Sequence, residues 1–127
     1  SVTRADWITS DKEHLDAYVT DPLCSFMFTV NAYYSMMAGM LGMQKKENIS
    51  MIPKSLPVLF VSGAEDPVGN FGKGVRKVCE IYKSAGLRDV SLKLYEGDRH
   101  EILNETNREQ VYQELYEWFE EKLSNRD

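Results

Sequence analysis

The chain has 127 residues, which is the size of one domain or of a part of one. Its formal net charge of −5 leaves no excess of basic side chains for binding to a nucleic-acid backbone, so we expect no nucleic-acid partner. An apolar fraction of 43% and a charged fraction of 28% are ordinary values for a globular domain.

The residues that commonly bind metals are few and scattered. Cys24 and Cys79 lie far apart, and we interpret them as free thiols of a reducing compartment. His14 and His100 are the only imidazoles, so a structural zinc site is not expected. Residues 1–16 lack the basic start and apolar core of a secretory signal, which favours a cytoplasmic location.

The first structural signal along the chain is a helix start. Ser10 and Glu13 have the spacing of a capping box, and they predict a helix over residues 11–20. Pro22 follows directly, and the residue before a proline avoids the helical conformation.

An uncharged segment follows the first helix. Residues 22–44 carry no charge, and all six methionines fall between Met27 and Met51. The length approaches that of a membrane span, but polar residues and glycines dilute it, so we expect no stable span. We predict a helix over residues 30–43 that is buried or lines a cleft. Its flexible methionines suit an apolar ligand of variable shape, and ordinary core packing is the alternative.

The second half of the chain has a β-α-β-α pattern. Residues 57–61 form an apolar run typical of a parallel strand that is covered on both faces. Residues 71–85 are amphipathic and end at Gly86, residues 90–95 alternate as a second strand, and residues 107–123 have helical spacing. Two such strands predict a parallel, right-handed crossover at a sheet edge. Two strands cannot cover their own edges, so the sheet is expected to be incomplete.

Each predicted strand ends at a glycine, and a polar loop with one notable titratable residue follows. These residues are Asp66 and His100. The carboxyl ends of parallel strands meet at one edge of a sheet, and acid before histidine is the order of a Ser-Asp-His relay. The alternatives are a solvated loop histidine and an aspartate that only forms a turn with Pro67.

Other polar residues surround these two. Glu65 and Asp98 are neighbouring carboxylates, and we expect both to be solvated. Glu101, Asn104 and Glu105 are expected to order the histidine loop and to lead into the last helix.

Three segments together resemble a known family. They read DWITSDKEHLDAYVTDPLC over residues 6–24, SGAEDPVG over residues 62–69 and YEGDRHEILNE over residues 95–105. They are similar to the C-terminal half of α/β-hydrolases of the monoacylglycerol-lipase-like and lysophospholipase-like group, also called serine aminopeptidase-like. The resemblance implies that Asp66 is the acid and His100 the base of a catalytic triad.

The resemblance also implies an organisation and a substrate. The fold class is α/β, the C-terminal portion of an α/β-hydrolase. Residues 1–52 would be the end of a helical cap with its connection to the core, and residues 53–127 the β-α-β-α part of the core. The expected substrate is a small acyl ester, lipid-like in its acyl chain, and no cofactor or metal is required. The residues expected to bind it lie in the cap: Phe26, Met36, Met37 and Met40.

One part of the family pattern is absent. The sequence contains no G-x-S-x-G motif and no HG-type oxyanion loop, and Ser62 lies in the acid motif with Phe60 two residues before it. We therefore expect the missing N-terminal half of the same enzyme to supply the serine, and this chain alone to be inactive. The alternatives are a degenerate, non-catalytic binding domain and a peptidase or small-ester hydrolase.

Overall fold

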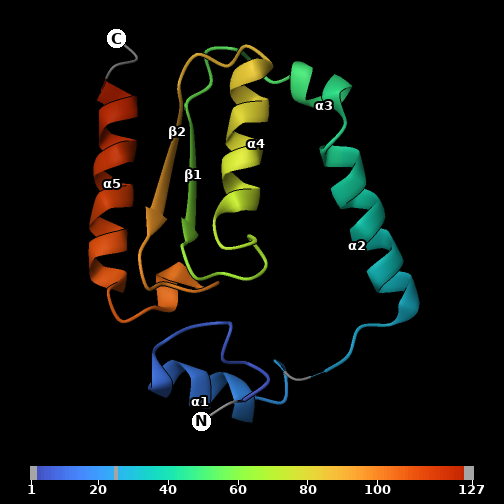
Figure 1. The fold of residues 1–127 in the computed structure, drawn as a ribbon, viewed down its shortest axis with the longest axis vertical. Coiled ribbons are helices and arrows are strands. Elements are labelled where there is room, and N and C mark those ends of the chain that lie inside the picture. The colour runs from blue at the N-terminus through green and yellow to red at the C-terminus, as the bar shows by residue number, and fades with distance from the viewer. Residues whose placement is uncertain (1–2, 25, 125–127) are drawn as a thin grey trace.

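The computed structural model describes residues 3–24 and 26–124 of the chain. The β-α-β-α order is confirmed, whereas the sequence pattern did not predict the short helices α3 and η1 (Figure 1). In chain order the elements are α1 (Lys12–Thr20), α2 (Val30–Met43), α3 (Lys46–Ser50), β1 (Val58–Gly63), α4 (Lys73–Ser84), β2 (Val90–Tyr95), the 3-10 helix η1 (Ile102–Asn104) and α5 (Arg108–Ser124).

The two strands form a parallel pair between two helices. β1 pairs with β2 along the whole of both strands, with Gly63 opposite Tyr95. α4 and α5 lie on opposite sides of the pair (Figure 1). On the α4 side, the ring of Phe60 packs edge-on against Tyr82 with 5.0 Å between the ring centroids. Both faces of β1 are therefore covered, which explains its continuous apolar sequence.

The core lies between the strands and α5. Tyr95, Ile102 and Val111 are buried together, and Val61 packs against them. The Tyr95 hydroxyl donates a hydrogen bond of 2.9 Å to Glu114 on α5. Burial, together with the Glu114 carboxylate, raises the pKa of Tyr95 to about 12. The hydroxyl therefore keeps its proton near neutral pH and continues to tie β2 to α5.

The start of α1 differs from the sequence prediction. The helix is capped by Asp11, whose carboxylate accepts from the backbone N–H groups of Glu13 and His14 at 3.0 and 3.1 Å. The capping box with Ser10 is therefore wrong. The Ser10 side chain and N–H instead donate to Glu105, a residue 95 positions away.

The uncharged segment forms the helix predicted for it but is not buried. α2 spans Val30–Met43 and has no buried residue, and it lies apart from the sheet (Figure 1). The edge of β1 away from β2 also has no strand partner within the described part of the chain. Both observations agree with a partial fold. None of the helices within residues 3–24 and 26–124 is long and apolar enough to cross a membrane.

The backbone of β1 is touched at its tip by the loop that follows β2. A Cβ atom at Gly63 would lie 2.1 Å from the carbonyl oxygen of Arg99 and 2.3 Å from that of Asp98. The N–H of Glu65 donates to the same Asp98 oxygen at 2.9 Å. Only glycine leaves room for this approach, so Gly63 determines where the loop after β2 can lie.

The substitution Gly63→Ala tests this contact. The added methyl group meets backbone atoms that can move only with their loop, so we expect a loss of about 3 kcal/mol in the free energy of unfolding. Urea unfolding of both proteins measures it. The control is Gly39→Ala in α2, where a Cβ has no atom within 4 Å; it should be neutral or add up to ~1 kcal/mol. Equal losses for the two variants would contradict the close approach.

Candidate active site

Asp66 is held in the loop after β1. The residue is only 5% exposed, and its Oδ1 accepts a hydrogen bond of 2.8 Å from the N–H of Val68. Its own carbonyl oxygen accepts from the N–H of Phe71 at 2.8 Å. The turn formed with Pro67 therefore orients the carboxylate, and its second oxygen is left for another partner.

His100 is held in the loop after β2 by the N-terminal segment. Its N–H donates to the carbonyl oxygen of Trp7 at 3.3 Å, and the next N–H, of Glu101, donates to Ile8 at 2.8 Å. The Trp7 ring lies 5.0 Å from the imidazole, with 51° between the two planes. The His100 side chain is 40% exposed, so solvent or a substrate can reach it.

The structure brings Asp66 and His100 into contact. His100 Nδ1 lies 3.0 Å from Asp66 Oδ2. An ionised carboxylate only accepts hydrogen bonds, so in the neutral imidazole Nδ1 carries the proton and Nε2 presents its lone pair. Nε2 has no hydrogen-bond partner within the described residues. Such an imidazole can take a proton from a hydroxyl group placed beside it.

The two neighbouring carboxylates differ in burial. Glu65 is exposed, as expected, but Asp98 is only 4% exposed, so the prediction that it is solvated is wrong. The loop that carries Asp98 folds back over the tip of β1, where the Asp98 carbonyl group lies against Gly63, instead of extending into solvent. Burial raises the pKa of Asp98 above its ordinary value; the charge of Glu105 adds to the shift, and the Asn107 side chain partly opposes it.

The raised pKa of Asp98 gives a prediction for stability against pH. The folded protein holds the Asp98 proton more tightly than the unfolded chain does. The contribution of Asp98 to stability is therefore full below the ordinary carboxyl pKa, and it declines as pH rises through the raised pKa. Asp98→Asn should remove this decline and stabilise the protein at pH 7 by on the order of 1 kcal/mol.

Urea unfolding at pH 4 and pH 7 measures this effect. Glu65→Gln is the matched control, since it removes an exposed carboxylate one loop away. If Asp98→Asn loses as much stability between the two pH values as the unmodified protein, ionisation of Asp98 does not cause the decline in stability.

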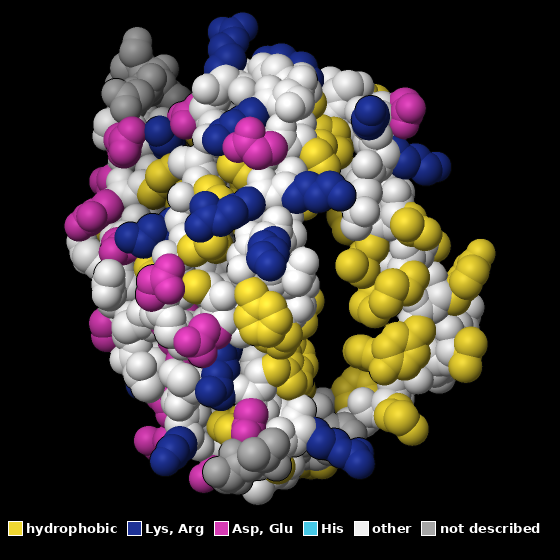
Figure 2. Space-filling view, in the orientation of Figure 1, with side chains coloured by type: hydrophobic (Ala, Val, Ile, Leu, Met, Phe, Trp, Pro, Cys, Tyr) yellow, Lys and Arg dark blue, Asp and Glu magenta, His cyan; other side chains and the backbone are white. Residues whose placement is uncertain are grey.

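The predicted substrate residues are exposed. Phe26 is 61% exposed, Met37 50%, and Met36 and Met40 43% each. Figure 2 shows apolar side chains along α2 on both of its visible flanks. Met40 lines a cavity of about 540 Å³ against Tyr82 and other residues of α4. Neither Asp66 nor His100 lines this cavity, so the structure joins the two polar residues but does not join the predicted substrate residues to them.

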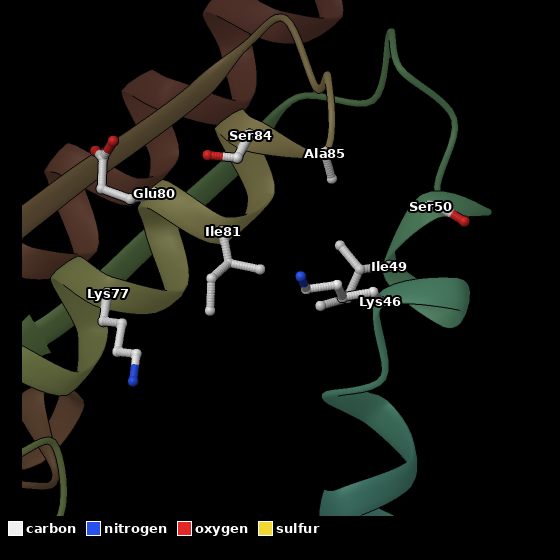
Figure 3. A pocket seen from close by; sticks show the side chains of 8 residues that line it. All are labelled: Lys46, Ile49, Ser50, Lys77, Glu80, Ile81, Ser84 and Ala85. Atoms are coloured by element: carbon white, nitrogen blue, oxygen red, sulfur yellow. The ribbon is translucent and has the colours of Figure 1, made fainter.

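A larger cavity of about 700 Å³ lies between α3 and the C-terminal half of α4 (Figure 3). Lys46 reaches toward it and Lys77 belongs to its lining, and Ile49 and Ile81 form much of its apolar wall (Figure 3). It is at the end of α4 remote from the acid loop (Figure 1). With neither His100 nor Asp66 in its lining, it lacks the acid and histidine pair, so its size does not make it the reactive site.

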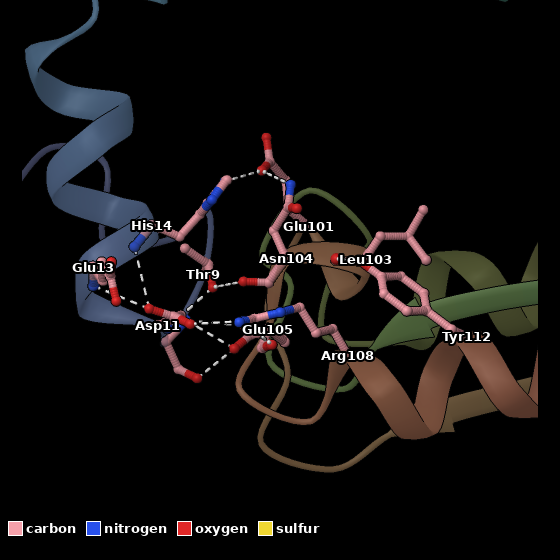
Figure 4. A network of polar contacts seen from close by, with 11 residues as sticks. Thr9, Asp11, Glu13, His14, Glu101, Leu103, Asn104, Glu105, Arg108 and Tyr112 are labelled. Carbon is pink, nitrogen blue, oxygen red and sulfur yellow. Dashed lines mark hydrogen bonds and ion pairs between the residues drawn. The ribbon is translucent and has the colours of Figure 1, made fainter.

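The contacts of the N-terminal segment with the histidine loop were missed by sequence reasoning. They form a polar network between α1 and the start of α5 (Figure 4). Asp11 pairs with Arg108 at 2.9 Å, and His14 is half-buried and lies 3.1 Å from Glu101. Nothing local in the sequence signals pairs so far apart. The sequence pointed to this network only through Glu101, Asn104 and Glu105, which were expected to order the histidine loop.

Metal-binding residues do not gather in the described part of the chain. No cluster of histidine, cysteine, aspartate and glutamate there could hold a metal ion. Cys24 is exposed and Cys79 is buried, and both are free thiols, as the sequence predicts.

The strand pair, its covering helices and the acid and histidine at the strand ends define the C-terminal part of an α/β-hydrolase fold. Residues 1–107 match the family described as serine aminopeptidase, S33, and the chain belongs to this family.

Solved structures agree with this fold. A highly thermostable carboxyl esterase from Bacillus coagulans, in complex with glycerol, is 29% identical over 94% of this chain, with a TM-score of 0.84. A lipase in its open form is 27% identical over 98% of this chain, with a TM-score of 0.77. A monoglyceride lipase from Saccharomyces cerevisiae is 22% identical over 95% of this chain, with a TM-score of 0.69, and shows the fold alone. The chain covers only 39% to 42% of the length of these structures.

Proposed function

We propose that this chain supplies the acid and the base of a serine hydrolase that cleaves carboxylic esters. The observation that carries the proposal is the 3.0 Å contact between Asp66 Oδ2 and His100 Nδ1. In the reaction, Nε2 of His100 takes the proton of the serine hydroxyl as that oxygen attacks the ester carbonyl, and then gives it to the leaving alcohol. Asp66 fixes the imidazole tautomer and stabilises the imidazolium.

The serine and the oxyanion donors would come from the N-terminal half of the enzyme. The sequence has no G-x-S-x-G motif, and this chain spans about 40% of the matched structures. The edge of β1 has no strand partner among the described residues, and α2 has no buried residue, so both offer that half a place to pack. The chain alone is then inactive. A cytoplasmic location of the enzyme stays a prediction.

The acyl group of the substrate is proposed to be lipid-like. α2 presents methionine and aromatic side chains without any charge, which suits an apolar chain. Lipase and carboxyl esterase among the similar structures point the same way. A peptidase is the second candidate, favoured by the family's description as serine aminopeptidase. A small-ester hydrolase and a non-catalytic binding domain are the remaining alternatives.

Substitutions at the pair test the mechanism in the full-length hydrolase that contains this chain. His100→Ala should lower kcat about 10³-fold or more, because it removes the imidazole that Asp66 orients as the base. Asp66→Asn should have a similar effect through the wrong imidazole tautomer. Initial rates with a chromogenic ester measure both. The control is His14→Ala, which replaces the other histidine of this chain and should leave turnover near normal. A fully active His100→Ala enzyme would exclude His100 as the base.

Substitution on α2 tests the substrate class. Met40→Gln should raise KM for esters of long acyl chains about 10-fold and change KM for acetyl esters little, since the loss grows with apolar contact. Rates over a series of acyl lengths measure this. The control is Met51→Gln, which is 74% exposed and lies outside α2. Faster cleavage of aminoacyl amides than of any ester would favour the peptidase.

A further inference from the structure

Glu105 is a fully buried carboxylate that the proposed mechanism leaves unused. It follows η1 and is 0% exposed. Its Oε1 accepts from the N–H of Arg99 at 2.9 Å, and the N–H of Ser10 donates to both oxygens, at 2.9 and 3.0 Å. The Ser10 hydroxyl donates to Oε2 as well. A buried charge is stable only with such donors, and every donor here comes from a different segment than Glu105 itself.

The donors belong to the two segments that meet at His100. Ser10 directly follows the Trp7–Thr9 stretch, and Arg99 immediately precedes His100. The carboxylate therefore bridges the N-terminal segment and the histidine loop from inside the protein. The Arg99 side chain also joins the histidine loop to the N-terminal segment. Its Nη1 donates to the carbonyl oxygens of Asp6 and Thr9, the latter at 3.2 Å.

The contact between the N-terminal segment and the histidine loop determines which groups surround the His100 imidazole. The N–H of His100 donates to the carbonyl oxygen of Trp7, and the Trp7 ring lies against the imidazole at 5.0 Å. Asp66, which follows the end of the neighbouring strand β1, holds Nδ1. If the two segments separated, His100 would keep only the Asp66 contact, and the direction of Nε2 would no longer be determined.

We propose that Glu105 is a positioning residue whose buried carboxylate clamps the Trp7–Ser10 segment to the histidine loop and thereby fixes the direction of His100 Nε2. The proposal deepens the proposed function and rests on His100 being the base. Glu105 touches neither the substrate nor the reacting atoms; it acts through Arg99, Ser10 and Trp7.

Glu105→Gln is the sharpest substitution because it keeps the shape of the side chain. A glutamine has one acceptor oxygen, and its NH₂ group would face an N–H donor of Ser10 or Arg99. At least one buried donor then loses its partner, and the two segments separate more often. The matched control is Glu80→Gln on α4, an exposed carboxylate paired with Lys83.

The experiment measures two quantities in the full-length hydrolase. Hydrogen exchange of the Arg99, His100 and Glu101 amides should become about 10-fold faster or more, while the amides of the β1–β2 ladder keep their rates. The value of kcat for the ester should fall about 10- to 100-fold with KM within about twofold, since orientation of the base is lost and not binding. Glu80→Gln should change neither.

Three results would overturn the proposal: unchanged exchange in the histidine loop, equally faster exchange in the strand ladder, or faster loop exchange with unchanged kcat. Ser10→Ala is the second variant, for use if Glu105→Gln does not fold. It removes one of the donors and should shift both quantities the same way by about two- to fivefold. If His100→Ala keeps its turnover, the proposed function fails, whereas the exchange result still reports on the Glu105 clamp.

Discussion

The site depends on the contact between the tip of β1 and the loop that follows β2. The carbonyl groups of Asp98 and Arg99 lie where a side chain at position 63 would be, and the loop is hydrogen-bonded there through Glu65. This contact and the parallel register of the strands together place His100 beside Asp66. A register slip of one residue would turn the side chains of β1 to the other face and separate the pair.

The histidine loop is held on two sides, whereas α2 is largely exposed. One side is the tip of β1, and the other is the N-terminal segment, which is joined to the loop through Glu105. The Asp11–Arg108 ion pair joins the same segment to α5 (Figure 4). α2 has no buried residue, and the helix that it mainly contacts is α3. Asp66 and His100 are thus held in place by contacts within this chain, and the surface proposed for the acyl group needs the rest of the hydrolase to become a pocket.

The sequence predicted the helices and strands whose formation depends on neighbouring residues. The apolar run after Pro57, the alternation over 90–95 and the uncharged stretch over 30–43 each gave the correct element. The meeting of Asp66 with His100 was predictable because the carboxyl ends of neighbouring parallel strands converge. The cap of α1 was not predictable, since Ser10 and Asp11 can both cap a helix and the choice depends on distant Glu105. The burial of Asp98 likewise follows from a contact between separate loops.

The central claim is that Nε2 of His100 faces the serine while Nδ1 stays on Asp66. The most direct measurement is a crystal structure of the full-length hydrolase with its serine covalently bound to an alkyl phosphonate. The account predicts His100 Nε2 within about 2.6–3.2 Å of an oxygen of the serine adduct, with the Asp66 contact intact. An adduct that faces another imidazole, or a His100 ring that has left Asp66, would contradict it.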